Sequence, residues 1–175
     1  MSFSNRNTNI KQKDKANDIF YTPKALVLKH LEYVKEYVDD NDIIFDGFYG
    51  SGNYFNLYSQ VFTKNNIFKY TEIELGTDFF KYTEPVNMII SNPPYSIIDK
   101  VLEKSVNLKP HTISYLIGQG NLTCKRIEFM NNNGYFLSKI FFTKVYSWFG
   151  MSLIVVFTNK ASHNCIDYDR IVWKQ

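Results

Sequence analysis

Residues 43–52 read IIFDGFYGSG. The apolar run 43–45 is short and continuous, which is typical of a buried parallel strand, and it leads through Asp46 into a segment with three glycines. Glycine allows a sharp turn and close approach of the backbone to a ligand, and a helix expected at 53–62 would present free amides to a carboxylate or phosphate. The stretch predicts an α/β protein with a ligand-binding loop, although an ordinary strand-to-helix turn remains the alternative.

Strands and helices alternate on both sides of this loop. Between Thr22 and Val38 apolar residues recur at helical spacing, and Thr22-Pro23 is a typical helix start because a threonine hydroxyl can cap free amides. Further strands are expected at 68–73, 86–90, 112–117, 135–146 and 151–158, and further helices at 97–106 and 123–132. This order favours a mostly parallel sheet with helices on both faces and an antiparallel edge hairpin that turns near Gly150.

The length, composition and charge of the chain limit the kinds of protein that it can be. With 175 residues, of which 45% are hydrophobic, the chain suits a single domain at 16–175 after a polar, flexible tail at 1–15. No apolar run approaches the roughly 18 residues of a membrane span and the start lacks a signal peptide, so an intracellular protein that is not secreted and contacts no membrane is expected. Two distant cysteines and three scattered histidines predict no disulfide framework and no metal site. The net charge of +3 is compatible with a polyanionic partner and decides nothing alone.

A second loop, Asn92-Pro93-Pro94-Tyr95, follows the expected strand 86–90. Two prolines would break a strand ladder, so they mark a rigid segment that leaves the sheet where ligands bind in open α/β folds. An aromatic exocyclic amine is a weak nucleophile because its lone pair is delocalised into the ring. The Asn92 side-chain oxygen and the Pro93 carbonyl can accept its two hydrogens, and Tyr95 can stack on the base. These four residues are predicted to be catalytic, with the prolines holding the acceptors in place.

An acidic residue completes the expected ligand site. Glu72 lies 20 residues after Gly52 and at the end of the expected strand 68–73, where a carboxylate can accept hydrogen bonds from ribose hydroxyls. Glu74 is an alternative for the same role.

The two loops, in this order, resemble the cofactor loop and the catalytic loop of the N6-adenine DNA methyltransferases. The upstream segment 17–23, NDIFYTP, is similar to a motif that helps bind the methionine part of the cofactor in that family. The resemblance implies a Rossmann-like sheet of seven strands and S-adenosylmethionine as cofactor. It also implies that Asp78 reads the cofactor's adenine amine with Phe79 beside the ring, and that 148–150 shapes the target-base pocket. Tyr49 is larger than the residue usual at its position in the family. The implied cofactor-binding residues are Phe20, Thr22, Pro23, Asp46, Phe48, Gly50, Gly52, Glu72, Asp78 and Phe79.

The acceptor stays open between several classes. The family implies N6 of adenine in DNA, but the sequence leaves little room for a target-recognition domain, so RNA bases, protein glutamine and a partner chain that supplies recognition are alternatives. A phosphate-binding role is open to four basic residues near the loops, although such charges usually are just solvated: Lys100, Lys104, Lys125 and Arg126. A non-catalytic cofactor-binding or nucleic-acid-binding subunit is a further alternative. A nicotinamide-dependent oxidoreductase ranks last, because it gives the proline loop no role.

Overall fold

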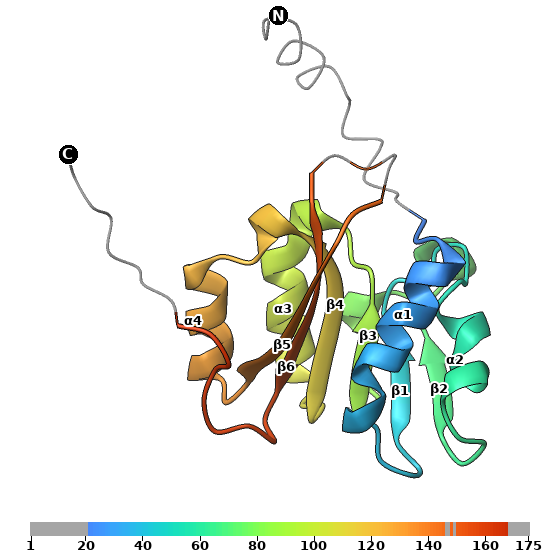
Figure 1. Cartoon of the computed structure of the whole chain (residues 1–175). Helices are drawn as coiled ribbons and strands as arrows, with labels where there is room; N and C mark the ends of the chain where they lie inside the picture. The colour runs from blue at the N-terminus through green and yellow to red at the C-terminus, as the bar shows by residue number, and fades with distance from the viewer. Residues whose placement is uncertain (1–20, 146–147, 149, 168–175) are drawn as a thin grey trace, which may run out of the picture.

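The computed structural model describes residues 21–145, 148 and 150–167. The predicted tail at 1–15 and Phe20 lie outside them. Among the described residues one sheet has six strands in the order β2-β1-β3-β4-β6-β5. The first four are parallel, and β6 runs antiparallel to β4 and β5, as Figure 1 shows. The strands are β1 Ile43–Asp46, β2 Ile67–Tyr70, β3 Met88–Ser91, β4 Thr112–Gly118, β5 Phe136–Thr143 and β6 Ser152–Thr158.

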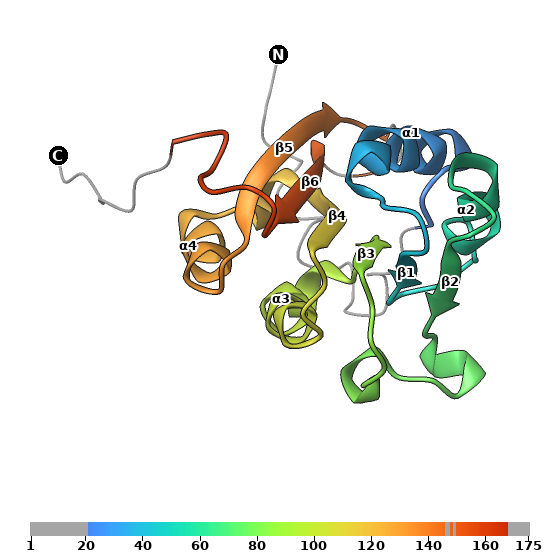
Figure 2. The same cartoon turned by 90° about the horizontal axis from the view of Figure 1, so that it is seen from below.

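In the part of the chain that the structure describes, four α-helices cover the two faces of this sheet. Figure 2 shows α1 and α2 on one face and α3 and α4 on the other. Successive strand residues point to opposite faces, so Ile44 packs under α1 and α2 whereas Phe45 packs on the α3 and α4 side. The predicted α/β architecture is therefore confirmed. The helices are α1 Lys24–Val34, α2 Phe55–Val61, α3 Ile98–Asn107 and α4 Cys124–Asn132, and short 3₁₀ helices are η2 Lys35–Tyr37, η3 Ile73–Leu75, η4 Phe79–Lys81, η5 Tyr95–Ile97 and η6 Gln119–Asn121.

Among the described residues the sheet has six strands, one fewer than the resemblance implies. The predicted strand 68–73 ends at Tyr70, because the next residue turns back over the glycine loop: Thr71 Oγ1 donates to the Gly47 carbonyl at 2.8 Å, and the Tyr49 amide donates to the Thr71 carbonyl at 3.1 Å. The chain then forms η3 and η4 and adds no seventh strand before β3.

Two other expectations are wrong in detail. The first helix is α-helical only to Val34, and η2 follows, so Val38 lies beyond both. Thr22 does not cap this helix. Pro23 is the N-cap, and the Thr22 hydroxyl accepts a hydrogen bond from Asn92 instead.

The antiparallel edge hairpin is confirmed. The connection between β5 and β6 covers 144–151, so β5 ends three residues before the predicted strand end at 146. Gly150 has a positive φ of 75°, which favours glycine. In the part of the chain that the structure describes, no helix is long and apolar enough to cross a membrane.

Candidate active site

A cavity of about 260 Å³ opens at the carboxyl ends of β1, β2 and β3. Both predicted loops contribute to its wall, so the glycine loop and the Asn-Pro-Pro-Tyr loop face one space although they are 40 residues apart in the chain. Ten of the predicted residues line it: Thr22, Phe48, Gly50, Glu72, Asp78, Phe79, Asn92, Pro93, Pro94 and Tyr95. Three others, Pro23, Asp46 and Gly52, do not line it.

The glycine loop is joined to the end of β2 by a charged hydrogen bond. The Gly50 amide donates to Glu72 Oε2 at 2.7 Å, and Gly50 has a φ of 51° that favours glycine. The backbone of Glu72 is held in turn, because its amide donates to Thr77 Oγ1 at 2.9 Å. The Glu72 carboxylate is thus fixed at the cavity wall, where Glu74 also lies.

An apolar slot lies beside Asp78. The rings of Phe48 and Phe79 have centroids 4.7 Å apart, and Phe79 is buried. A Cβ at Gly47 would stand 2.5 Å from Phe79 Cδ2, so only glycine lets the ring lie this close to the loop. Asp78 caps η4 by accepting the Phe80 amide at 2.9 Å. The slot and its neighbouring carboxylate suit a flat heterocycle with an amine at its edge.

The carboxyl group of Asp46 lies behind the wall and joins β1 to β3. Asp46 Oδ1 accepts the Ser91 hydroxyl at 2.5 Å and the Phe48 amide at 3.2 Å, and Oδ2 is buried without a hydrogen-bond partner among the described residues. Burial raises the pKa of Asp46 to about 7, and the nearby Glu72 adds to the rise. The neutral form of Asp46 is therefore favoured below that pH, and a cationic ligand in the cavity would favour its charged form.

Gly52 and Pro23 shape the backbone next to the cavity and do not line it. Gly52 has a φ of 76°, and a Cβ there would stand 2.6 Å from the Tyr49 ring. That ring packs against Tyr70, with centroids 4.4 Å apart, so the large Tyr49 side chain is accommodated over the β2 edge. Pro23 starts α1.

The Asn-Pro-Pro-Tyr loop is anchored at its first residue. Asn92 Nδ2 donates to Thr22 Oγ1 at 3.1 Å, across 70 positions of sequence. Pro93 is buried, and after Pro94 the chain turns directly into η5. The Tyr95 ring lies so close to Gly118 that a Cβ there would be 3.4 Å from Tyr95 Cε2, which places the ring between the loop and the end of β4.

Several wall residues were missed from the sequence. The aromatic residues Tyr21, Tyr54 and Phe80 line the cavity, and so does Asn53, whose side chain donates to the Thr22 carbonyl at 2.8 Å. Tyr54 had a usable signal, because it lies just after the glycine loop at the predicted helix start. The hydrogen bond between Asn53 and Thr22 had none, because it joins segments 31 positions apart.

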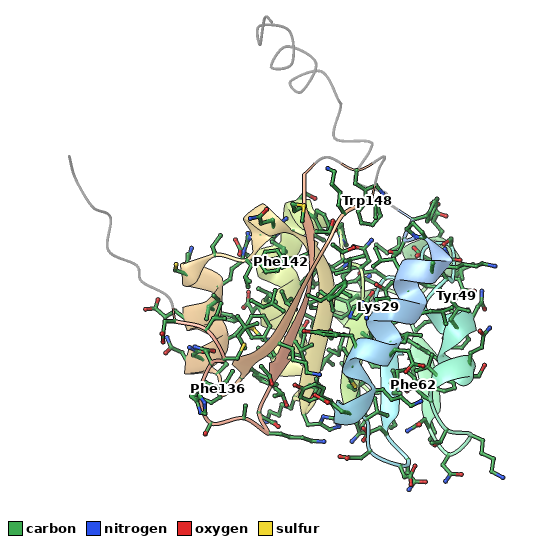
Figure 3. The ribbon with its side chains drawn as sticks, viewed as in Figure 1. Lys29, Tyr49, Phe62, Phe136, Phe142 and Trp148 are labelled. Atoms are coloured by element: carbon green, nitrogen blue, oxygen red, sulfur yellow. The ribbon has the colours of Figure 1, made fainter. Side chains whose placement is uncertain are left out.

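The predicted turn 148–150 does not reach the cavity wall with its described residues. Trp148 is buried against Leu116 and Ile154 and is not among the residues that line the cavity, and Figure 3 places it above the strands. Phe149 lies outside the described residues.

Two of the four basic residues are held by neighbours. Lys104 Nζ donates to the Tyr82 carbonyl at 2.7 Å, and Arg126 pairs with Asp99 at 2.7 Å. Lys100 and Lys125 are exposed. Lys104 and Arg126 thus have structural partners, whereas a phosphate-binding role for Lys100 and Lys125 stays a prediction.

The histidines are used in hydrogen bonds. His30 is fully buried between Tyr54 and Ser114. His111 pairs with Asp42 at 2.9 Å at the opposite end of the sheet, where Asp39 also lies within ligand distance and pairs with Lys160 at 2.6 Å. This cluster contains a hydrogen bond between His111 and Asp42 and an ion pair between Asp39 and Lys160.

Comparison with known proteins identifies the fold. No family model matches the sequence, and no curated protein matches it significantly. Solved methyltransferase structures do match the coordinates. A protein from Pyrococcus horikoshii described as a candidate RNA methyltransferase has a TM-score of 0.65 at 14% identity, over 79% of this chain and 85% of that one.

Two further structures extend the comparison. TrmN from Thermus thermophilus has a TM-score of 0.59 at 13% identity over 77% of this chain, which spans about half (48%) of that protein. Mtq2 from E. cuniculi, solved in the Mtq2–Trm112 complex responsible for methylation of the eRF1 translation termination factor, has a TM-score of 0.53 at 14% identity over 79% of this chain and 97% of that one. The chain thus has a Rossmann-like methyltransferase fold.

Proposed function

We propose that this chain is an S-adenosylmethionine-dependent methyltransferase that methylates an exocyclic amine, namely N6 of adenine in nucleic acid, with DNA as the first expected substrate. One observation carries the proposal: Asn92 and Pro93 line the same cavity as Gly50 and Glu72. Acceptors for an amine therefore lie beside a loop suited to a nucleoside cofactor.

The cavity fits the cofactor by its chemistry. Glu72 offers a fixed carboxylate to ribose hydroxyls, and Asp78 with the Phe48 and Phe79 slot offers an edge acceptor and flat apolar faces to adenine. Asp46 supplies a buried carboxyl group behind the part that would hold the cationic methionine end. The bound cofactor supplies an electrophilic methyl group on a positively charged sulfur.

The chain's own contribution is to hold and orient the amine. The Asn92 side-chain oxygen and the Pro93 carbonyl accept its two hydrogens, which draws the nitrogen lone pair out of conjugation with the ring. Tyr95 stacks on the base and holds it in line. Held in this way by Asn92 and Pro93, the nitrogen lone pair would be free to take the methyl group that S-adenosylmethionine would supply, with the bonding electrons left on the cofactor's sulfur, and the surplus proton on the product nitrogen would pass to water.

The acceptor class can be identified by labelling. The full chain is incubated with methyl-tritiated S-adenosylmethionine and separate pools of single-stranded DNA, duplex DNA, RNA and protein, and the labelled pool is digested to its units. Label in N6-methyladenine supports the proposal. Label in protein glutamine would move the proposal to a protein substrate, and cofactor binding without label in any pool would indicate a non-catalytic subunit or a missing partner chain.

A further inference from the structure

The end of β4 lies beside the candidate active site, on the far side of β3 from the glycine loop. The sheet order places β3 between β1 and β4, and the cavity takes its wall from the ends of β1, β2 and β3. The target base must bring its amine to the Asn-Pro-Pro-Tyr loop at the end of β3 without entering the space of the cofactor. The ring of the base should therefore extend toward the end of β4, where Gly118 leads into η6.

An asparagine of η6 lies close to Tyr95 at this place. A Cβ at Gly118 would stand 3.3 Å from Asn121 Nδ2 and 3.4 Å from Tyr95 Cε2, so the amide and the ring approach the same bare backbone. A side chain at Gly118 would push against both groups. Asn121 is half-buried and does not line the cavity, whereas Tyr95 does. Asn121 is thus placed next to the ring that is proposed to stack on the base, outside the space of the cofactor.

The orientation of the Asn121 amide is fixed by Arg126, on α4. Arg126 Nη1 donates to Asn121 Oδ1 at 3.2 Å and to the Asn121 carbonyl at 2.8 Å, and Arg126 Nε donates to Asp99 at 2.7 Å. A guanidinium group has no acceptor, so the oxygen of the amide faces Arg126 and the nitrogen faces Gly118 and Tyr95. Among the described residues Asn121 Nδ2 makes no hydrogen bond, so its two hydrogens are available to a ligand.

We propose that Asn121 selects adenine as the target base, by donating a hydrogen bond from Nδ2 to N1 of the base that stacks on Tyr95. This inference rests on the proposed function. Adenine N1 lies next to the carbon that carries the amine, and its lone pair can accept this hydrogen bond. Guanine carries a hydrogen at the same position, which would meet the hydrogens of Asn121. Because N7 is an acceptor in both purines, a donor placed at N1 is able to distinguish them.

Arg126 is a positioning residue for this contact. The two ends of an asparagine amide have almost the same shape, so packing alone distinguishes them poorly. With the ends exchanged, Asn121 would present an oxygen to the lone pair of N1, and its hydrogens would meet those of Arg126. The guanidinium group excludes that orientation, and its pair with Asp99 joins the start of α4 to the start of α3. The donor is therefore in place before the base arrives.

A substrate that lacks one ring nitrogen tests the contact. The full chain is assayed with a nucleic-acid strand that contains a single adenine and with the same strand containing 1-deazaadenine, in which a C–H group replaces N1. We expect the preference in kcat/KM for adenine over 1-deazaadenine to be about five- to tenfold smaller in Asn121→Ala than in wild type, because the variant has no hydrogen bond to N1 to lose. The cofactor Kd should change less than about twofold, since Asn121 lies outside the cavity wall.

Two further variants and a second analogue serve as controls. Gln119→Ala removes an exposed amide from the same 3₁₀ helix and should keep the wild-type preference. A strand with 7-deazaadenine, which lacks N7, should be discriminated equally by wild type and Asn121→Ala. Asn121→Asp keeps the shape of the side chain and an oxygen for Arg126 but replaces the donor by a second acceptor. It should therefore lower kcat/KM for adenine at least as much as Asn121→Ala.

The outcomes separate the two proposals. Methylation of adenine by wild type, with the same preference over 1-deazaadenine in folded Asn121→Ala, would overturn the role of Asn121 and leave the proposed function intact. A changed preference in Gln119→Ala alone would do the same. If Asn121→Ala does not fold, Asn121→Asp decides, because unchanged activity on adenine in that variant overturns the inference. If wild type labels no adenine at all, the proposed function fails and this inference fails with it.

Discussion

Asp46 Oδ1 and Ser91 Oγ lie 2.5 Å apart and join the carboxyl ends of β1 and β3 beneath the cavity. The pair connects the two loops of the candidate site, because the glycine loop begins directly after Asp46 and the Asn-Pro-Pro-Tyr loop directly after Ser91. The second carboxyl oxygen of Asp46, Oδ2, is buried without a hydrogen-bond partner among the described residues. The protonation of Asp46 should therefore affect the stability of the folded protein.

The first prediction concerns pH. Burial raises the pKa of Asp46 from 3.8 to about 7, so the neutral form is favoured in the folded state. The stabilisation that this shift provides is complete below pH 3.8 and is lost as the pH rises through about 7. The unfolding free energy of the ligand-free wild-type protein should therefore fall between pH 5 and pH 8. Asp46→Asn should make this fall smaller by roughly 2–4 kcal/mol.

Urea unfolding at several pH values measures this difference. Asp39→Asn is the control. Lys160 lowers the pKa of the exposed Asp39, so this substitution should change the pH dependence of the unfolding free energy only at acid pH. Parallel curves for wild type and Asp46→Asn between pH 5 and pH 8 would show that Asp46 has no raised pKa.

The second prediction concerns the close contact of Gly47 with Phe79. Gly47→Ala places a Cβ 2.5 Å from the buried ring, so the ring must leave the slot beside Asp78. We expect cofactor affinity to fall by about tenfold or more, equivalent to roughly 1.4 kcal/mol. Calorimetric titration measures it, with Gly120→Ala as control because nothing lies within 4 Å of a Cβ at Gly120. Unchanged affinity in folded Gly47→Ala would exclude the slot as the adenine site.

The third prediction distinguishes the two glutamates. Glu72 accepts the Gly50 amide at 2.7 Å and is held at the wall, whereas Glu74 is more exposed on η3. Glu72→Gln should weaken cofactor binding by roughly 1.5–3 kcal/mol, because hydrogen bonds to a charged group are lost, and Glu74→Gln should have a smaller effect. A larger loss in Glu74→Gln would assign the ribose to Glu74.

The fourth prediction separates chemistry from binding. Asn92→Ala removes one acceptor of the amine and should lower kcat by about 10²–10³-fold, while the cofactor Kd stays within about threefold. Asn133→Ala, at the exposed end of α4, is the control. Equal losses of cofactor binding and transfer in Asn92→Ala would mean that Asn92 belongs to the cofactor site.

Much of the fold could be predicted because its signals are local. Continuous apolar runs predicted the buried strands, and glycines and prolines predicted the two loops at their ends. The end of β2 could not be predicted, because Thr71 is turned by hydrogen bonds to the glycine loop that depend on the folded chain. The prediction that the Thr22 hydroxyl caps a helix was wrong for the same reason. Its hydrogen-bond partner, Asn92, lies 70 positions away in the sequence and is brought close only by folding.

The candidate site was predicted unevenly. Its motif residues line one cavity, whereas the hydrogen bonds of Asn53 and Asn92 to Thr22 follow no local pattern, because they join segments 31 and 70 positions apart. Asp46 was expected at the ligand and lies behind the wall, since its carboxyl group is used on Ser91 and Phe48. The residues that line the cavity could therefore be predicted from the sequence better than the residues whose hydrogen bonds position them.

The most direct measurement of the central claim is the digestion of a nucleic-acid pool after incubation of the full chain with methyl-tritiated S-adenosylmethionine. The account predicts radioactivity in N6-methyladenine, and none above background when Asn92→Ala replaces the wild-type chain. Folded, cofactor-binding wild-type protein that leaves adenine unlabelled, or an Asn92→Ala variant that labels it equally well, would contradict the account.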